Sequence, residues 1–256
     1  MNIHKTAIID PKSELADDIS VGPYAVIDAN VKIGSGAKIG PHCVINEYTQ
    51  IGKNCHIFPG AVIGSVSQDK KYNGEKSFLK IGDNNIIREY VTMNRGTNDG
   101  STTMVGNNNL FMAYSHVAHD CNIGNEVVLA NSVALAGHVC LQDGAIIGGL
   151  TGVHQFVRIG ELAIVGGCSK AGQDIVPFSV SDGHRAKVYG VNTIGLDRRG
   201  YAEGVKENLK KAFKIIFSMK LNIKNALKKV EKEIPPSKEV TKLIDFIKSS
   251  QRGIAR

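Results

Sequence analysis

A six-residue period dominates the sequence from residue 3 to about residue 170. Every sixth position from Ile3 holds a large apolar side chain, here termed an anchor, except where polar segments intervene around Asp69, Glu75 and Asp99. The anchors are Ile3, Ile9, Leu15, Val21, Ile27, Ile33, Ile39, Ile45, Ile51, Ile57, Ile63, Ile81, Ile87, Met93, Val105, Phe111, Val117, Ile123, Leu129, Leu135, Leu141, Ile147, Val153, Ile159 and Val165. An α-helix cannot place these residues on one face, because its 3.6-residue turn does not divide six into one phase. The period therefore predicts a parallel β-helix.

A second position of the repeat supports this fold. Four residues after an anchor the side chain is usually small, as at Ala7, Ala25, Ala37, Cys43, Thr49, Cys55, Ala61, Cys121, Ala145 and Ala163. Glycine often follows the anchor directly, as at Gly22, Gly34, Gly40, Gly52, Gly82, Gly124, Gly148 and Gly160. We expect a three-sided prism in which the anchor fills the interior, the small residue fits near the next corner, and glycine eases the turn.

The prism geometry predicts which residues stack on one another. Three sides of six residues make a coil of 18 residues, so residue i should lie beneath residue i+18 at the strand spacing of ~4.8 Å. The cysteines Cys43, Cys55 and Cys121 occupy the small interior position, where we expect them to act as core residues. The repeat is expected to end after Val165.

Beyond the repeat the chain becomes basic. The segment from Asp197 to Arg256 has 16 Lys/Arg and 7 Asp/Glu, a net charge of +9, so the preceding residues sum to −2 given the +7 of the whole chain. Charge concentrated at one end favours an acidic partner. Nucleic acid is not expected as that partner, because no aromatic-basic motif accompanies the charge.

The basic segment also has helical periodicity. Apolar residues between Val205 and Phe217 follow helical spacing, and two further helices are predicted near 222–233 and 238–249, the last with Ser237 as its cap. We therefore expect two domains, a β-helix over residues 1–194 and a helical domain over residues 195–256.

The composition bears on the expected location of the protein. No apolar run approaches the ~20 residues that a membrane helix needs, so no stable membrane insertion is expected. The first residues lead straight into the repeat, without the basic and then apolar pattern of a signal peptide. Five cysteines without a CxxC pair are typical of reduced thiols. These features together favour a cytoplasmic protein.

The densest polar departure from the repeat is the run from His116 to Cys121, followed by His138 and by the pair His154-Gln155. By the 18-residue rule, Asp120 should lie beneath His138, and His119 beneath Gly137. An imidazole beside a backbone N–H that no side chain shields offers a general base next to an oxyanion donor. Acyl transfer to a hydroxyl needs this pair of groups, and Asp120 could orient the imidazole.

Several longer motifs resemble those of a known family. They are His-Val-Ala-His-Asp-Cys at 116–121, Leu-Ala-Gly-His-Val at 135–139, Ile-Gly-Gly-Leu-Thr-Gly-Val-His-Gln-Phe at 147–156, Val-Gly-Gly-Cys-Ser at 165–169, Gly-Val-Asn at 190–192 and Gly-Leu-Asp-Arg-Arg-Gly at 195–200. Along nearly its whole length the chain resembles the acyl-[acyl-carrier-protein]–UDP-N-acetylglucosamine O-acyltransferases, members of the hexapeptide-repeat acyltransferases. The resemblance implies a left-handed β-helix, a homotrimer with sites between subunits, and the first step of lipid A synthesis without a metal or other cofactor.

The resemblance also implies roles for individual residues. His119 would deprotonate the sugar 3-hydroxyl of UDP-N-acetylglucosamine, Asp120 would orient His119, and Gly137 would supply the oxyanion N–H. The residues expected to contact the nucleotide sugar or the acyl group are Gln68, Asp69, Lys71, His116, His138, His154, Gln155, Asn192 and Arg199. Arg198 would meet the acidic acyl carrier protein.

The glycines Gly149 and Gly167 are one coil apart, and positions without side chains on adjacent rungs should leave a vertical groove. In the family this site measures acyl length, because a bulky residue closes the channel. The resemblance therefore implies that this protein takes a longer 3-hydroxyacyl chain.

Three alternatives remain open from the sequence. Ile194 stands where better-known family members have an acidic residue, which favours testing a 3-amino sugar analogue as acceptor. The histidines His116, His119 and His138 could instead hold zinc in an enzyme of the carbonic anhydrase type. A non-catalytic β-helical scaffold would explain the repeat, but it gives no reason for the histidine cluster or the basic tail.

Overall fold

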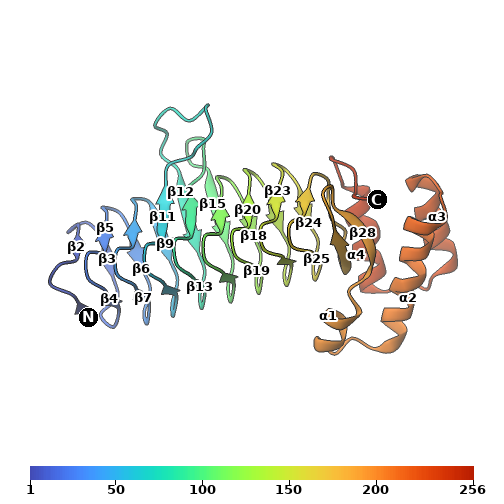
Figure 1. Cartoon of the computed structure of the whole chain (residues 1–256), viewed down its shortest axis with the longest axis horizontal. Helices are drawn as coiled ribbons and strands as arrows, with labels where there is room; N and C mark the ends of the chain where they lie inside the picture. The colour runs from blue at the N-terminus through green and yellow to red at the C-terminus, as the bar shows by residue number, and fades with distance from the viewer.

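A computed structural model describes residues 1–256 and confirms the parallel β-helix (Figure 1). Three sheets form the sides of an elongated prism. The first sheet contains β1 (Asn2–Ile3), β4 (Ser20–Val21), β7 (Lys38–Ile39), β10 (His56–Ile57), β13 (Ile86–Ile87), β16 (Leu110–Phe111), β19 (Val128–Leu129), β22 (Ile146–Ile147), β25 (Ile164–Val165), β27 (Ser179–Asp182) and β28 (Lys187–Val191). The second contains β2 (Ile8–Ile9), β5 (Val26–Ile27), β8 (Val44–Ile45), β11 (Val62–Ser65), β14 (Thr92–Asn94), β17 (His116–Val117), β20 (Ala134–Leu135), β23 (Gly152–Val153) and β26 (Lys170–Ala171). The third contains β3 (Glu14–Leu15), β6 (Lys32–Ile33), β9 (Thr49–Ile51), β12 (Phe78–Ile81), β15 (Thr102–Val105), β18 (Asn122–Ile123), β21 (Cys140–Leu141) and β24 (Arg158–Ile159).

The prism interior is filled as the repeat predicts. Anchors such as Ile45 and Leu129 are fully buried, and they belong to one hydrophobic cluster of 42 residues. The small residues Ala25, Cys43 and Cys55 belong to the same cluster and are also fully buried. The two repeat positions therefore form the core together.

The role expected for glycine after the anchor is wrong. The left-handed backbone conformation occurs three residues after the anchor, for example at Tyr24 and His42, with φ of 57° and 56°. Glycine directly after the anchor is instead required by the close approach of the next coil. A Cβ on Gly34 would lie 2.9 Å from the carbonyl carbon of Gly52. Coil stacking, rather than turn formation, selects glycine there.

Two loops interrupt the 18-residue register. Ile51 pairs with Ile81, an offset of 30 residues, and Ile81 pairs with Val105, an offset of 24. The extra residues form the long loop (66–77) and the short loop (95–101). Figure 1 shows the loop between β11 and β12 projecting from the prism, at the polar segment that interrupts the anchor series around Asp69 and Glu75.

The coil continues beyond Val165, where the regular anchor series ends. β26 extends the second sheet, β27 extends the first, and β28 then turns back antiparallel to β27. The sequence gives little sign of this last part, because the anchor series loses its phase while the backbone pairing persists.

The C-terminal region is helical, as predicted. It comprises α1 (Thr193–Arg198), α2 (Glu203–Phe213), the π-helix η1 (Lys214–Ser218), α3 (Ile223–Glu233) and α4 (Lys238–Lys248). The Ser237 side chain accepts a hydrogen bond from the N–H of Val240, as expected of a helix cap. None of these helices combines the length and apolarity needed to cross a membrane.

A second hydrophobic cluster of 19 residues joins the helices to the end of the prism. It includes Leu162, Val176 and Phe178 from the coil beside residues of all the later helices. The end of the chain also returns to the prism, where Ile254 forms a bridge with Asp174. The division at residue 194 stays a prediction, and hydrophobic packing is continuous across it.

Candidate active site

A cavity of about 800 Å³ lies on the second sheet and extends to both of its corners. Outward residues of β17, β20, β23 and β26 form its floor, and the long loop forms one wall. Its lining contains Gln68, Asp69, His116, Ala118, His119, Ala134, Leu135, Ala136, Gly137, Leu150, Gly152, Val153, His154, Gln155, Cys168, Ser169, Lys170 and His184. Seven of the predicted site residues therefore meet at one cavity.

His119 lies at the corner after β17 and is only 8 % exposed. Its Nδ1 is 2.9 Å from Asp120 Oδ2 and 2.8 Å from Thr97 Oγ1. Its Nε2 lies on the side of the long loop, 3.9 Å from Asp69 Oδ2. A neutral imidazole that donates from Nδ1 to the Asp120 carboxylate keeps Nε2 as the basic atom. The arrangement can therefore accept a proton at the cavity.

Asp120 is held by backbone and side-chain contacts. It has a left-handed conformation with φ of 59°, and its N–H donates to Thr103 Oγ1 at 2.8 Å. Its carboxylate accepts the Thr97 N–H at 3.1 Å. Burial raises the pKa of Asp120, but hydrogen bonds from His119 and Thr97 outweigh burial and leave the pKa below its usual value. Asp120 is therefore an ionised partner for His119.

Gly137 lies directly above His119, as the 18-residue rule predicts. The His138 N–H donates to the His119 carbonyl at 3.0 Å, and a Cβ on Gly137 would lie 2.3 Å from His119 Cε1. The Gly137 N–H donates to no backbone carbonyl of the chain. A glycine is needed here for space, and its N–H is left for a ligand.

The remaining predicted residues near the cavity differ in position. His116 Nδ1 lies 2.7 Å from Thr92 Oγ1, and burial lowers the pKa of His116. His154 lines the cavity and is exposed. His138 does not line the cavity, and its ring stacks on Phe156 with centroids 4.5 Å apart.

Lys71 also lies outside the lining, although its backbone N–H donates to Asp69 Oδ1 at 2.9 Å. The long loop thus brings Gln68 and Asp69 to the cavity and leaves Lys71 exposed outside its lining.

Gly149 and Gly167 stack as expected. A Cβ on Gly167 would lie 3.2 Å from the Gly149 carbonyl oxygen, and the residues that follow them, Leu150 and Cys168, line the cavity. The two glycines therefore lie beside one end of the cavity without forming its wall.

The predicted residues of the C-terminal motif lie elsewhere in the chain. Asn192 is 4 % exposed, and its amide caps α1 by accepting the Gly195 N–H while donating to the Leu162 carbonyl. Arg199 forms an ion pair with Glu126, and Arg198 is exposed in the last turn of α1. None of the three lines the cavity of its own chain.

Two residues of the site have no counterpart in the sequence-based predictions. Thr97, in the short loop, contacts His119, and Ser67, in the long loop, contacts Thr97 with 2.8 Å between hydroxyl oxygens. Both lie where the repeat is interrupted, so the 18-residue rule could not align them with His119. The unusual burial of these hydroxyls is visible only in the folded chain.

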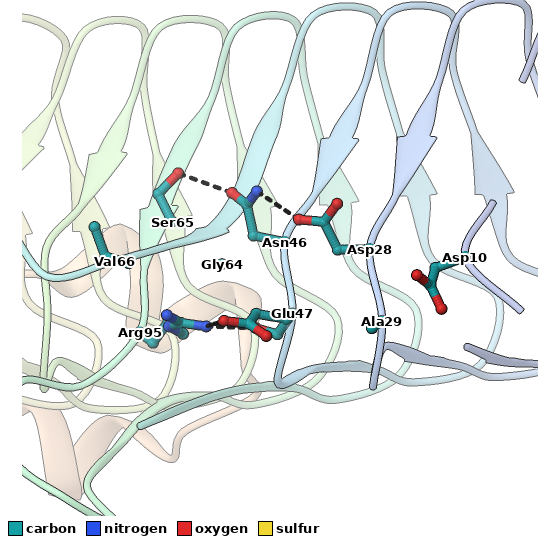
Figure 2. Close-up of a pocket in the computed structure, with 9 residues that line it drawn as sticks. All are labelled: Asp10, Asp28, Ala29, Asn46, Glu47, Gly64, Ser65, Val66 and Arg95. Atoms are coloured by element: carbon teal, nitrogen blue, oxygen red, sulfur yellow. Dashed lines mark hydrogen bonds and ion pairs between the residues drawn. The ribbon is translucent and has the colours of Figure 1, made fainter. Parts of the chain in front are cut away.

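A second cavity, of about 490 Å³, lies further toward the N-terminus on the second sheet (Figure 2). Asp28 and Ser65 flank Asn46 and hydrogen-bond to it in a column that crosses three coils. Arg95 of the short loop is nearly buried at the other side and lies 3.5 Å from a carboxylate oxygen of Glu47. Val66, the first residue of the long loop, also lines this cavity.

The zinc alternative requires His116, His119 and His138 to lie close together. Atoms of His119, Asp120 and His138 lie within 4.8 Å of one another, whereas His116 is outside this group. The predicted set of three histidines is therefore not brought together, and His116 Nδ1 is already engaged by Thr92.

Hexapeptide coils carrying a histidine–aspartate pair beside a free glycine N–H define an acyltransferase of the hexapeptide-repeat class. A family model described as bacterial transferase hexapeptide (six repeats) matches residues 30–65, and one described as UDP N-acetylglucosamine O-acyltransferase, domain 2, matches residues 174–255.

Full-length relatives narrow the class to one family. The chain is 51 % identical over 255 residues to the acyl-[acyl-carrier-protein]–UDP-N-acetylglucosamine O-acyltransferase of Thermodesulfovibrio yellowstonii and 52 % identical over 255 residues to that of Alkalilimnicola ehrlichii, covering 99 % of each chain in both cases. Among solved structures, LpxA from Acinetobacter baumannii has a TM-score of 0.96 at 41 % identity, and LpxA from Bacteroides fragilis has 0.97 at 43 %, again with 99 % of each chain covered.

This chain belongs to the acyl-[acyl-carrier-protein]–UDP-N-acetylglucosamine O-acyltransferase family. The comparisons thereby confirm the expected enzyme class and the left-handed β-helix with a helical C-terminal region. The scaffold alternative is not supported, because the full-length relatives are named as enzymes.

Proposed function

We propose that this protein transfers a 3-hydroxyacyl chain from acyl carrier protein to the 3-hydroxyl of UDP-N-acetylglucosamine, the first step of lipid A synthesis, as a cytoplasmic enzyme. The observation that carries the proposal is His119, whose Nδ1 contacts Asp120 while its Nε2 lies beside Asp69 at the cavity. Family membership supports the two substrates, because both appear in the names of the full-length relatives.

The geometry supports a direct transfer. His119 Nε2 takes the proton of the sugar hydroxyl as the oxygen attacks the thioester carbonyl. The Gly137 N–H stabilises the resulting oxyanion, after which the C–S bond breaks and the proton passes to the carrier thiolate. We expect no covalent acyl-enzyme. The neighbouring thiol Cys121 is buried, and burial raises its pKa to about 12, so it is a poor nucleophile.

The remaining roles belong to the same proposal. Gln68, Asp69, His116, His154 and Gln155 would contact the sugar or acyl group, since all five line the cavity. The groove at Gly149 and Gly167 would take a longer acyl chain than a bulky residue at position 167 would allow. Arg198, exposed on α1, would meet the acidic carrier protein.

A homotrimer is part of the proposal because two residues expected to hold UDP lie outside the cavity of their own chain. Asn192 and Arg199 do not line the cavity of their own chain, so any contact with UDP there would come from a neighbouring copy. An outward apolar stripe on the first sheet offers a packing surface. Its members pair in register, and they are Ile86, Leu110, Val128, Ile146, Ile164 and Val180.

The test is acyl transfer from a 3-hydroxyacyl carrier protein to UDP-N-acetylglucosamine. We expect wild-type turnover and a loss of ~10²–10⁴-fold in His119→Ala, the usual contribution of a positioned base. His42→Ala is the control, because His42 stacks on Tyr24 near the N-terminus and should retain wild-type turnover.

Turnover only with the 3-amino analogue of UDP-N-acetylglucosamine would show that the acceptor is an amine. The replacement of the family's acidic residue by Ile194 is consistent with that result. Failure with both acceptors, or full activity of His119→Ala, would contradict the proposed function or the proposed base, respectively.

A further inference from the structure

Thr97 joins two parts of the site that come from different interruptions of the repeat. Its Oγ1 lies 2.8 Å from His119 Nδ1 and 2.8 Å from Ser67 Oγ. Ser67 precedes Gln68 and Asp69 in the long loop, whereas Thr97 belongs to the short loop. Thr97, Ser67 and His119 are each more than nine-tenths buried, so water does not readily replace these contacts.

The hydrogen-bond directions follow from what each atom can donate. When Nδ1–H of His119 points to Asp120, Thr97 Oγ1 can only accept from that nitrogen, which leaves the Thr97 hydroxyl hydrogen for Ser67 Oγ. Ser67 Oγ also accepts the Asp69 N–H at 3.1 Å. A continuous hydrogen-bond chain therefore connects the imidazole to the backbone of Asp69.

This chain closes into a ring around the base. The Asp69 carboxylate lies 3.9 Å from His119 Nε2, on the opposite side of the imidazole from Thr97. Thr97 thus acts on one ring nitrogen directly and, through Ser67, fixes the loop carboxylate that faces the other nitrogen. The orientation of the base and the position of the loop are coupled.

We propose that Thr97 is a positioning residue that couples the base to the substrate-binding part of the long loop, an inference that rests on the proposed role of His119. Losing the Thr97 hydroxyl should misplace the imidazole and Asp69 together. Displacement of about 1 Å can cost about 100-fold in rate. The expected signature is a lower kcat together with a higher KM for the nucleotide sugar, while KM for the acyl carrier protein stays unchanged.

The long loop has a second attachment that provides a matched control. Arg95 donates from Nη2 to the Tyr72 hydroxyl at 3.4 Å and from Nη1 to the Glu47 carbonyl at 2.9 Å. Figure 2 shows Arg95 beside Glu47 in the N-terminal cavity, whose lining also includes Val66 at the start of this loop. Tyr72→Phe therefore removes a hydrogen bond to the same loop and leaves the contact between Thr97 and His119 in place.

The experiment is steady-state kinetics with each substrate varied, together with melting temperatures. Thr97→Val is expected to lower kcat by about 10- to 100-fold and to raise KM for UDP-N-acetylglucosamine. Thr97→Ser, which keeps the hydroxyl, should recover kcat to within about threefold of wild type, and Tyr72→Phe should stay within the same range. Ser67→Ala combined with Thr97→Val should be no worse than Thr97→Val alone, because both break one chain.

Three results would overturn the inference: wild-type kinetics in Thr97→Val, a Thr97→Ser enzyme as slow as Thr97→Val, or independent multiplication of the Ser67 and Thr97 effects. If Thr97→Val does not fold, Ser67→Ala decides, and an unchanged KM for the sugar then rejects the coupling. His119→Ala in the same series separates the two proposals. Full activity there removes the proposed base, whereas loss there with normal Thr97 variants removes only the coupling.

Discussion

Asp120, His138 and Phe156 occupy the same left-handed corner on three successive coils, with φ of 59°, 60° and 65°. Such a conformation costs a non-glycine residue roughly 1–2 kcal/mol, so the fold must hold each one in place. The His138 and Phe156 rings stack with centroids 4.5 Å apart. His138 Nε2 also lies 3.8 Å from Asp120 Oδ2. At the residue scale, this column stiffens the corner that carries His119.

The cysteines give a residue-scale prediction. Burial raises the pKa of Cys43 to about 11 and that of Cys121 to about 12, and it also raises the pKa of Cys55. Only a thiolate reacts readily with an alkylating reagent. At pH 8 the native protein should therefore be labelled at exposed Cys168, while these three interior thiols react only after unfolding.

Mass spectrometry of digested samples would locate the label. Cys168→Ser should abolish the rapid reaction, and rapid native labelling of Cys43 or Cys121 would show that the prism core opens far more often than its packing indicates.

At the element scale, the spacing between coils governs which residues the repeat tolerates. Gly34 and Gly172 both follow an anchor position, yet their surroundings differ. A Cβ on Gly34 would meet the backbone of the next coil at 2.9 Å, whereas nothing lies within 4 Å of a Cβ on Gly172, close to the last coil. The same repeat position is therefore restrictive inside the stack and permissive at its end.

This difference predicts the stability of two alanine variants. Gly34→Ala should lower the free energy of unfolding by about 1–3 kcal/mol, as expected for overpacking. Gly172→Ala should change it by less than about 0.5 kcal/mol. Denaturant titrations would measure the free energy of unfolding of both variants. Equal destabilisation by Gly34→Ala and Gly172→Ala would show that contact with the next coil is not the reason for glycine at position 34.

At the scale of the whole molecule, one continuous structure combines two cores. The prism cluster has 42 buried residues and the helical cluster has 19, and coil residues such as Phe178 belong to the second cluster. Arg158 of β24 reinforces the junction, because it donates to Asp174 Oδ2 at 3.1 Å and to the Phe246 carbonyl at 2.8 Å. The helical end is thus fixed to the prism by polar and apolar contacts.

The outward apolar stripe of the first sheet predicts the behaviour of the assembly. In sedimentation experiments the protein should have about three times its 27.5 kDa chain mass. Ile146→Lys should shift the population toward single chains, because a charge buried in an interface without a partner is unfavourable. Met104→Lys, at a similarly exposed apolar position on the third sheet, is the control. A wild-type protein that sediments as a monomer would contradict the proposed homotrimer.

The sequence by itself determined the prism, its interior and the stacking of His119 beneath Gly137, because a strict period fixes both the buried face and the neighbour one coil away. It also indicated the helical tail and the segment that leaves the prism, through helical spacing and the break in the anchor series. Long motifs then identified the family.

Only the tertiary structure decided how the two loops meet the base. An offset of 30 or 24 residues has no period from which contacts could be read, so the positions of Ser67 and Thr97 depend on how the loops pack. The same holds for Asn192, whose amide caps α1 within its own chain, because capping depends on a local backbone geometry that the motif does not specify. Periodic contacts follow from the sequence, whereas contacts between interruptions follow from the folded chain.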